Sequence, residues 1–300
     1  MKMLESTNQD VARTAATMHT YLERSIALPA ALMRHARLPS ISLLLGTAGP
    51  GMAHEDLAVV GDFINFIFAV DDLVDEGDLD LGEIEERLAC YAACAAGESR
   101  PQVALDPMAL YLCSLAERLR RAPLGSVLWP LWTQRIHEML GAMVAERRAS
   151  EVFPSSGELP DLERYLATGR HSIGVAASVM IAWMLLGETG IDAALLAAEE
   201  ALSRAVRIAN DLRSDERERD EGKVNAVVIA GEHGKAGLRH RMSVELERGH
   251  ALLAGSRNTR SADFLGRFAS FMVDLYSKHD FHSSPSAAMF LEAVAPPHVA

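Results

Sequence analysis

The sequence predicts an all-α fold, a single-domain helical bundle of about ten helices. Apolar residues recur with helical spacing, and the sustained alternation typical of strands is absent. Proline and glycine divide the chain into segments of roughly 15 to 30 residues, lengths typical of helices. Because no linker or repeat interrupts the pattern, residues 1–300 are expected to form one domain, with 1–20 and 284–300 as segments that could be flexible.

Helix boundaries are predicted where breakers gather: 38–39, 46–52, 101–107, 121–126, 153–160, 187–190 and 231–237. Residues 57–70 are apolar almost all round, so a helix there belongs at the centre of the bundle. The longest uncharged, apolar-rich run, residues 172–187, is shorter than the ~20 residues needed to span a bilayer. We therefore expect a buried core helix and no stable membrane insertion.

The net charge indicates which kinds of partner the protein could bind, and the cysteine content indicates the cellular compartment. The net charge of −12 argues against a nucleic-acid partner, which would need a basic face. It leaves room for an anionic ligand that is bridged to the protein by metal ions. The N-terminus has no continuous apolar signal-peptide core, and the three cysteines are too sparse for a disulfide framework. A cytoplasmic protein with reduced thiols is expected.

A first candidate site comes directly after the apolar run, in "DDLVDEGD" (residues 71–78). On a helix, Asp71 lies near Asp75 at i,i+4, and Asp72 near Asp75 at i,i+3, so three carboxylates can converge. This is unfavourable without compensation, because a helix C-terminus already carries partial negative charge. A Mg²⁺ ion, which prefers oxygen ligands, would reverse the repulsion. The alternative is an exposed helix end with solvated acidic side chains.

A second candidate site lies in "RIANDLRSDERERDEG" (residues 207–222). Asn210, Ser214 and Glu218 are spaced i, i+4, i+8 and share an arc of about 80° on one helix face. They offer three oxygen donors for a hard cation, and interleaved arginines such as Arg217 suit a phosphate group. The alternative is a surface helix of mixed charge, which does not explain why Asn and Ser share the stripe.

Together the clusters resemble the paired motifs of class I terpene synthases, which ionise prenyl diphosphates. "DDLVD" is similar to the family's DDxxD motif, and "NDLRSDERE" to its Asn-Asp-x-x-Ser-x-x-x-Glu motif, in the same order and at a matching separation. Arg170 resembles the diphosphate-sensing Arg, with Arg164 as a second candidate, and Gly174 stands where the family's helix breaks beside the substrate. The Arg-Tyr pair of many bacterial members is missing near the C-terminus, where Tyr276 and Lys278 could substitute.

The resemblance implies a central apolar cavity and three Mg²⁺ ions, for which Mn²⁺ could substitute. The metal ligands it implies are Asp71, Asp72, Asp75, Asn210, Ser214 and Glu218. It implies catalytic roles for Asp71, Asp72 and Arg170 in diphosphate departure, and diphosphate contacts from Arg170, Arg217, Lys278 and Tyr276. Residues expected at the cavity are Phe63, Phe66, Phe68, Gly174, Trp183 and Phe271, although core packing is the alternative for each aromatic ring.

The "SKHDFHSS" stretch (residues 277–284) resembles labdane-related, kaurene synthase-like diterpene synthases of bacteria. It implies a C20 substrate, either a labdane-type diphosphate such as copalyl diphosphate or geranylgeranyl diphosphate. A sesquiterpene synthase acting on farnesyl diphosphate is the first alternative. A non-catalytic helical scaffold with acidic interaction faces is the second. A homodimer is compatible with the sequence.

Overall fold

The computed structural model describes residues 16–17, 19–20, 34, 37–76, 78–98, 106–188, 190–231, 234–279 and 281. Within these ranges the regular elements are helices and none is a strand, which confirms the predicted all-α class. The segments predicted as flexible, 1–20 and 284–300, lie outside the described residues apart from positions 16, 17, 19 and 20.

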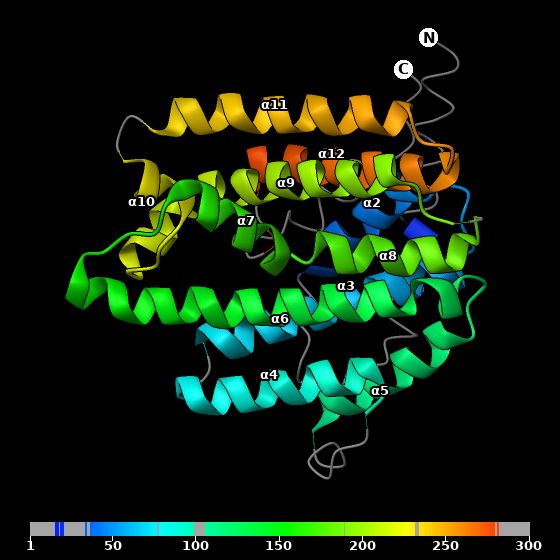
Figure 1. Cartoon of the computed structure of the whole chain (residues 1–300), viewed down its shortest axis with the longest axis horizontal. Coiled ribbons are helices and arrows are strands. Elements are labelled where there is room, and N and C mark those ends of the chain that lie inside the picture. The colour runs from blue at the N-terminus through cyan, green and yellow to red at the C-terminus, as the bar shows by residue number, and fades with distance from the viewer. Residues whose placement is uncertain are drawn as a thin grey trace, which may run out of the picture.

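The helices follow one another along the chain as Figure 1 shows. They are α2 (Leu38–Ala48), α3 (His54–Glu76), α4 (Leu81–Ala96), α5 (Pro107–Arg120), α6 (Gly125–Ser156), α7 (Leu162–Ser172), α8 (Val175–Leu186), α9 (Ala193–Asp220), α10 (Ala226–Ala230), α11 (Gly234–Ala254) and α12 (Thr259–Lys278). The predicted breakers fall at helix ends, except that α6 continues three residues past Phe153. It stops at Gly157, whose left-handed φ of +66° ends the helix.

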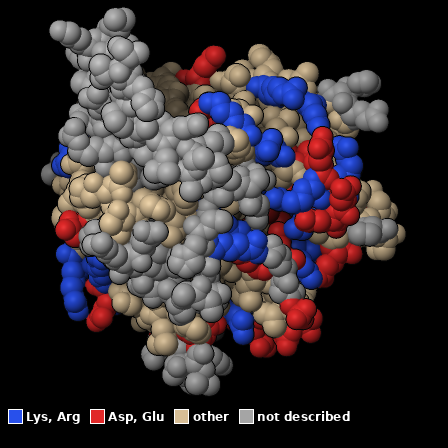
Figure 2. Space-filling model, turned by 180° about the vertical axis from the view of Figure 1, so that it is seen from behind, with Lys and Arg blue, Asp and Glu red and all other residues tan. Residues whose placement is uncertain are grey.

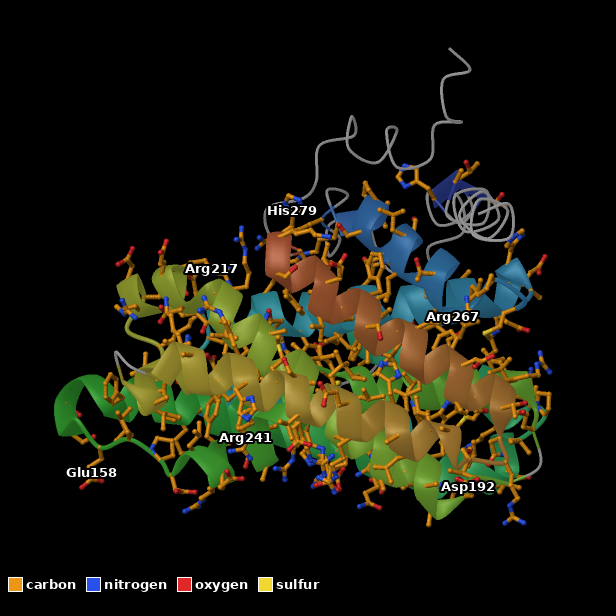
Figure 3. The ribbon with its side chains drawn as sticks, turned by 90° about the horizontal axis from the view of Figure 1, so that it is seen from above. Glu158, Asp192, Arg217, Arg241, Arg267 and His279 are labelled. Atoms are coloured by element: carbon orange, nitrogen blue, oxygen red, sulfur yellow. The ribbon has the colours of Figure 1, made fainter. Side chains whose placement is uncertain are left out.

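The helices α9 and α12 run side by side from the same end of the molecule (Figure 3). Figure 1 shows α11 lying along α9, with α12 behind α9, and both helices contact α9. The Asp192 carboxylate, which caps α9, also accepts hydrogen bonds from the Arg257 N–H and the Ser256 hydroxyl just before α12. Both helices then end near Arg217 and His279, at the opposite end from Asp192 (Figure 3). This parallel course brings Tyr276 of α12 to the cavity that Asn210 of α9 also lines.

The helices α3 and α8 form the centre of the bundle, as their apolar sequences predict. Every residue of α8 from Val175 to Met184 is buried, and Trp183 is completely enclosed. Among the described helices, none is by itself long and apolar enough to cross a membrane. Only α7 and α8 together reach that length and composition, and they are bent by 43° where they join.

A glycine makes the bend between α7 and α8 possible. Gly174 has a φ of +71°, which side chains disfavour. A Cβ atom there would lie 2.5 Å from Cδ1 of Ile67 on α3, so the break can approach α3 closely only with glycine.

Gly174→Ala should therefore lower the free energy of unfolding by about 1–2 kcal/mol more than Gly157→Ala. Both glycines have a left-handed φ, but a Cβ at Gly157 would meet no atom within 4 Å. The pair thus separates backbone strain from the collision with Ile67. Urea unfolding of the two variants measures the difference, and equal losses would show that Ile67 moves aside without cost.

Acidic and basic side chains are interspersed on the face shown in Figure 2, over the part that the structure describes. No continuous basic patch forms on that described surface.

The three cysteines are unpaired, as predicted. Cys90 and Cys94 are buried, and Cys113 is half-buried. Burial raises the pKa of the Cys94 thiol, so these residues behave as small apolar groups.

Candidate active site

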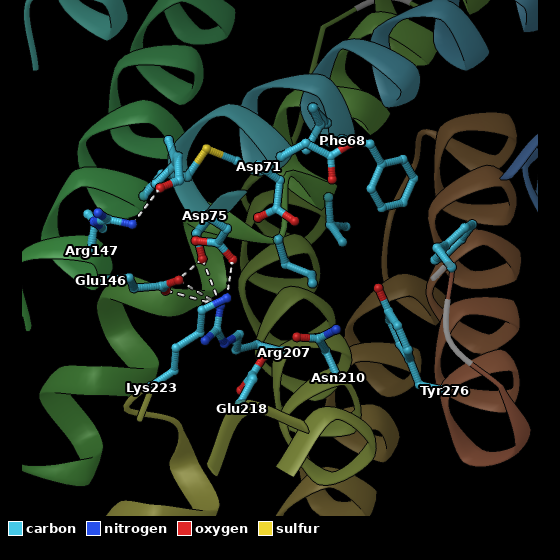
Figure 4. Close-up of a pocket in the computed structure, with 18 of the residues that line it drawn as sticks. Phe68, Asp71, Asp75, Glu146, Arg147, Arg207, Asn210, Glu218, Lys223 and Tyr276 are labelled. Carbon is cyan, nitrogen blue, oxygen red and sulfur yellow. Dashed lines mark hydrogen bonds and ion pairs between the residues drawn. The ribbon is translucent and has the colours of Figure 1, made fainter. Parts of the chain in front are cut away.

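A cavity of about 520 Å³ opens between α3, α6, α9 and α12, beside the break between α7 and α8 (Figure 4). Seven acidic and four basic side chains line it, contributed by the C-terminal part of α3, by α6, by α9 and by the turn after α9. The rest of its wall is mainly apolar and comes from α2, α3, α8 and α12. One cavity therefore combines a charged region with an apolar region.

The first predicted cluster lies on the wall formed by α3. Asp71, Asp72 and Asp75 all line the cavity, together with Ile64 and Phe68 from preceding turns. The positions 64, 68, 71 and 75 follow the helical period, so one stripe changes from apolar to acidic towards the end of α3. The acidic cluster is thus not a fully solvated helix end.

Two arginines bind one carboxylate of this cluster. The guanidinium of buried Arg37 donates two hydrogen bonds to Asp72, both 2.9 Å long, and lies 4.5 Å from the ring centroid of Phe68. Arg34 makes a further ion pair with Asp72 at 3.1 Å. The segment before α2 is thereby joined to the site, and Asp72 is oriented from its outer side.

The second predicted cluster faces α3 from α9. Asn210, Arg217 and Glu218 line the cavity, and Figure 4 shows Asn210 and Glu218 across from Asp71 and Asp75. Ser214 is buried but is not part of the lining, because its hydroxyl donates to the backbone oxygen of Asn210 at 3.0 Å. The amide of Asn225, which caps α10, donates to Glu218 at 2.9 Å and fixes that carboxylate.

A lysine joins the two clusters across the cavity. Lys223, in the turn after α9, donates to Asp75 at 2.8 Å and pairs with Glu221 at 2.7 Å (Figure 4). Burial alone would lower the pKa of Lys223, but Asp75 and Glu221 raise it, so the side chain stays protonated. The contact links residues 148 positions apart in sequence.

A buried arginine holds the floor of the charged region. Arg207 forms ion pairs with Glu146 of α6 at 3.0 Å and with Asp211 at 2.9 Å. Its guanidinium also donates to the hydroxyls of Ser172 and Tyr165. Burial alone would lower the pKa of Arg207, but the two carboxylates raise it well above its usual value. Glu146, Ser172 and Arg207 all line the cavity, so this network ties α6, α7 and α9 together there.

Asp71 differs from its neighbours because no hydrogen bond or ion pair joins it to another described residue. Burial, together with the negative charges of Asp75, Asp72 and Glu146, raises the pKa of the Asp71 carboxyl to about 7. A carboxylate surrounded by other carboxylates, facing a cavity and lacking a cationic partner, has the chemistry of a cation ligand.

This raised pKa predicts a pH-dependent stability for the protein in EDTA. Between the usual carboxyl pKa of 3.8 and about 7, folded Asp71 keeps a proton that the unfolded chain has lost. The free energy of unfolding contributed by this group therefore falls as pH rises through that window and levels off above it. Asp71→Asn should remove this contribution. Urea unfolding at several pH values measures the difference between the two proteins, and parallel curves would contradict the assignment.

The structure does not bring every predicted site residue to the cavity. Arg170 instead points towards buried Glu199 of α9, 3.8 Å away. The reason is helical geometry. Ser172 is the residue of α7 that lines the cavity, and Arg170, two residues earlier, lies about 200° around the helix from it and so points away. Lys278 is bound to Asp274, and Arg164 is exposed. Neither belongs to the lining, whereas Tyr276 does.

Most of the predicted cavity aromatics pack elsewhere. Phe63 and Phe66 stack on each other at 5.8 Å and contact rings of α4, α5 and α6. Trp183 donates to the backbone oxygen of Ser261 on α12. Phe271, which is half-buried, and Gly174, which allows the bend between α7 and α8, also lie outside the lining. Of the six predicted cavity residues, Phe68 is the one that lines it. The rings at the cavity are Phe68, Phe268, Tyr276 and Phe281.

Sequence reasoning missed several charged residues of the cavity. Arg207 had a local signal, because it lies one helical turn before Asn210 on the same stripe. Glu146 and Lys223 had no such local signal. Glu146 reaches the cavity through the packing of α6, and Lys223 through the turn after α9. Arg37, which binds Asp72, also lay outside any motif.

No three carboxylate, imidazole or thiol groups among the described residues converge on one point as they stand. Asp72 is turned towards Arg37, and Asp75 towards Lys223. Mg²⁺ typically takes only one or two carboxylates together with water and phosphate oxygens. The donor set, which is all oxygen and lies on two facing helices, fits such ions when an anionic ligand completes their coordination.

Comparison with protein-family models identifies the relationship of the sequence. Residues 62–238, more than half of the chain, match the model described as "Terpene synthase family 2, C-terminal metal binding". A search of curated proteins found no match.

Solved structures share the fold at low sequence identity. Linalool/nerolidol synthase from Streptomyces clavuligerus, in complex with 2-fluorogeranyl diphosphate, has a TM-score of 0.64 and 18% identity, over 89% of this chain and 94% of that one. The structure of 2-methylisoborneol synthase from Streptomyces coelicolor A3(2), in complex with Mg²⁺ and 2-fluoroneryl diphosphate, has a TM-score of 0.70 and 15% identity, over 92% of this chain and 94% of that one. Abietadiene synthase from Abies grandis has a TM-score of 0.66 and 17% identity, over 97% of this chain and 40% of that one.

Proposed function

The chain belongs to the terpene synthase family and is a class I enzyme, and we propose that its substrate is a C20 prenyl diphosphate. Either a labdane-type substrate such as copalyl diphosphate or geranylgeranyl diphosphate would serve. The two-part cavity supports a prenyl diphosphate, because a charged region suits the diphosphate and an apolar region suits an isoprenoid chain. The C20 length rests on the resemblance of residues 277–284 to labdane-related diterpene synthases. The enzyme would yield a terpene hydrocarbon or alcohol.

The charged region would hold the metal ions that the family name implies. Asp71, Asp72 and Asp75 would bind two Mg²⁺ ions, and Asn210, Ser214 and Glu218 a third. Ser214 would have to turn its hydroxyl from the Asn210 backbone oxygen towards the cavity to join that ion. Mn²⁺, with similar oxygen preferences, could replace Mg²⁺. When bound, the ions would supply Lewis-acid stabilisation of the leaving diphosphate. The Asp71 carboxylate, with which no described residue pairs, is the group most ready for this role, because binding a cation would relieve its repulsion by neighbouring carboxylates.

The cationic side chains of the cavity would orient the diphosphate. Arg207, Arg217 and Lys223 line the charged region, and the Tyr276 hydroxyl faces it from α12. Arg207 and Lys223 now neutralise Glu146 and Asp75. We assign to these residues the diphosphate contacts that the motif resemblance gave to Arg170 and Lys278, because those two side chains lie off the cavity. Arg170 would then support α7 through Glu199.

The apolar region would control the fate of the cation that ionisation creates. Heterolysis leaves the bonding electron pair on the diphosphate oxygen and an allylic cation in the cavity. Apolar walls would exclude water, and the rings of Phe68, Phe268 and Phe281 would stabilise nearby positive charge through their faces. Reaction ends when the cation loses a proton or captures a water molecule.

Product analysis tests the proposal. Purified protein with Mg²⁺ would be incubated separately with geranyl, farnesyl, geranylgeranyl and copalyl diphosphates, and products identified by gas chromatography–mass spectrometry. We expect a terpene from a C20 substrate and its loss in EDTA. Turnover of farnesyl or geranyl diphosphate alone would overturn the C20 assignment but leave the reaction class intact. No turnover of any substrate would overturn the proposed reaction.

Farnesyl diphosphate remains the second candidate substrate, supported by the similarity of the fold to a linalool/nerolidol synthase. The scaffold alternative is set aside, because the sequence match to a metal-binding terpene synthase domain spans both clusters.

A further inference from the structure

A hydroxyl group in the cavity wall has no hydrogen-bond partner among the described residues. Ser178 lies on the first turns of α8, is completely buried, and lines the cavity. Its Oγ has no hydrogen-bond partner in the described part of the chain. Buried hydroxyls are normally paired, because an unpaired one loses its hydration without replacement.

Local alternatives for this hydroxyl are not used. A serine in a helix often donates to the carbonyl three or four residues earlier. Ser42 does so with Leu38 at 2.7 Å, and Ser172 with Gly169 at 2.9 Å. Ser178 makes no such bond within the described residues, although its N–H donates to Gly174 at 3.1 Å. Its oxygen is therefore available to whatever occupies the cavity.

The helix α8 contributes no charged residue to the cavity lining. The other residue of α8 that lines the cavity is Val175, and α8 packs against α3, α6 and α12. Those helices contribute apolar lining residues such as Ile64 and Met272. The charged lining residues come from the end of α3, from α6, from α9 and from the turn after it, but none from α8. Ser178 thus places a hydroxyl dipole on the wall formed by α8, which itself supplies none of the charged lining residues.

We propose that the Ser178 hydroxyl determines product specificity by stabilising one of the carbocations formed along the isoprenoid chain. This inference rests on the proposed function. A neutral hydroxyl can turn its oxygen lone pairs towards a positive charge. In a cavity that excludes water, such a dipole has a stronger effect than in solution. No bond forms to the oxygen, and the final proton leaves elsewhere.

The expected effect falls on product ratio rather than on ionisation. The diphosphate departs in the charged region, which contains no residue of α8. A cation whose charge lies beside Ser178 would be favoured over isomers with charge elsewhere. Loss of one interaction of hydrogen-bond strength corresponds to a change of about fivefold in the ratio of two competing products.

The test compares Ser178→Ala, Ser178→Thr and Ser178→Val with wild type, on whichever of the four prenyl diphosphates wild type converts. Thr and Val have the same shape and differ in the hydroxyl, so this pair separates polarity from volume. Ser40→Ala is the matched control, because Ser40 is equally buried and its hydroxyl is unpaired among the described residues, yet it is not part of the cavity lining. Products are quantified by gas chromatography–mass spectrometry, and total turnover by diphosphate release.

The expected result is a product ratio altered about fivefold in the Ala and Val variants, with Thr and Ser40→Ala close to wild type. Wild-type ratios in the Ala and Val variants would overturn the inference while leaving the proposed function intact. Equal changes in Thr and Val would assign the effect to volume and also overturn it. If wild type released no diphosphate from any substrate, the proposed function would fail and this inference with it.

Discussion

Asp71→Asn should lower kcat/KM about 10³-fold with every prenyl diphosphate the enzyme accepts and, in EDTA at neutral pH, raise the melting temperature. The two changes have one cause. Asp71 contributes negative charge to a cavity where Asp72, Asp75 and Glu146 already repel it, and no described residue pairs with it. Removing the charge relieves that repulsion and also removes the ligand proposed for Mg²⁺.

Steady-state kinetics and thermal unfolding of the same preparation measure both effects. Asp78→Asn is the matched control, because Asp78 belongs to the same acidic stretch but is exposed and lies outside the cavity lining. It should leave kcat/KM and melting temperature close to wild type. A loss of activity accompanied by a lower melting temperature in Asp71→Asn would instead indicate a structural role for this carboxylate.

Arg207→Met should lower the free energy of unfolding by about 3–5 kcal/mol. Met keeps much of the length of the side chain but removes the cation between Glu146 and Asp211. Asp211 is completely buried, and burial is the largest cause that raises its pKa, to about 7. Without Arg207, both carboxylates would have to bind protons or remain charged without compensation, and either outcome destabilises the fold.

Urea unfolding measures this loss, with Arg213→Met as the control from the exposed face of the same helix. The control should change the free energy of unfolding by less than about 0.5 kcal/mol. Adding Glu146→Gln to Arg207→Met should recover part of the loss, because one unpaired charge is removed. If Arg207→Met were as stable as the control, the network would not hold α6, α7 and α9 together.

Local chemistry in the sequence determined the helical class and the two oxygen-rich stripes. The apolar period fixed which segments become helices, and breakers such as Gly187 fixed where they end. Asp71 and Asp75, or Asn210 and Glu218, share a face because the helical repeat dictates it, whatever the helix packs against. Both pairs therefore reach the cavity as the spacing predicted.

Packing alone decided which other residues join them. The run 57–70 is apolar on all sides, so its sequence cannot show that Phe68 faces the cavity while Phe63 faces away. Arg170 matches the motif, yet the angle at which α7 packs on α9 directs it to Glu199. Arg37 and Lys223 pair with aspartates far away in sequence, because only the assembled bundle brings these segments together. A helix fixes the relative directions of its own side chains, whereas the neighbour each side chain meets depends on how helices cross, which is a property of the whole fold.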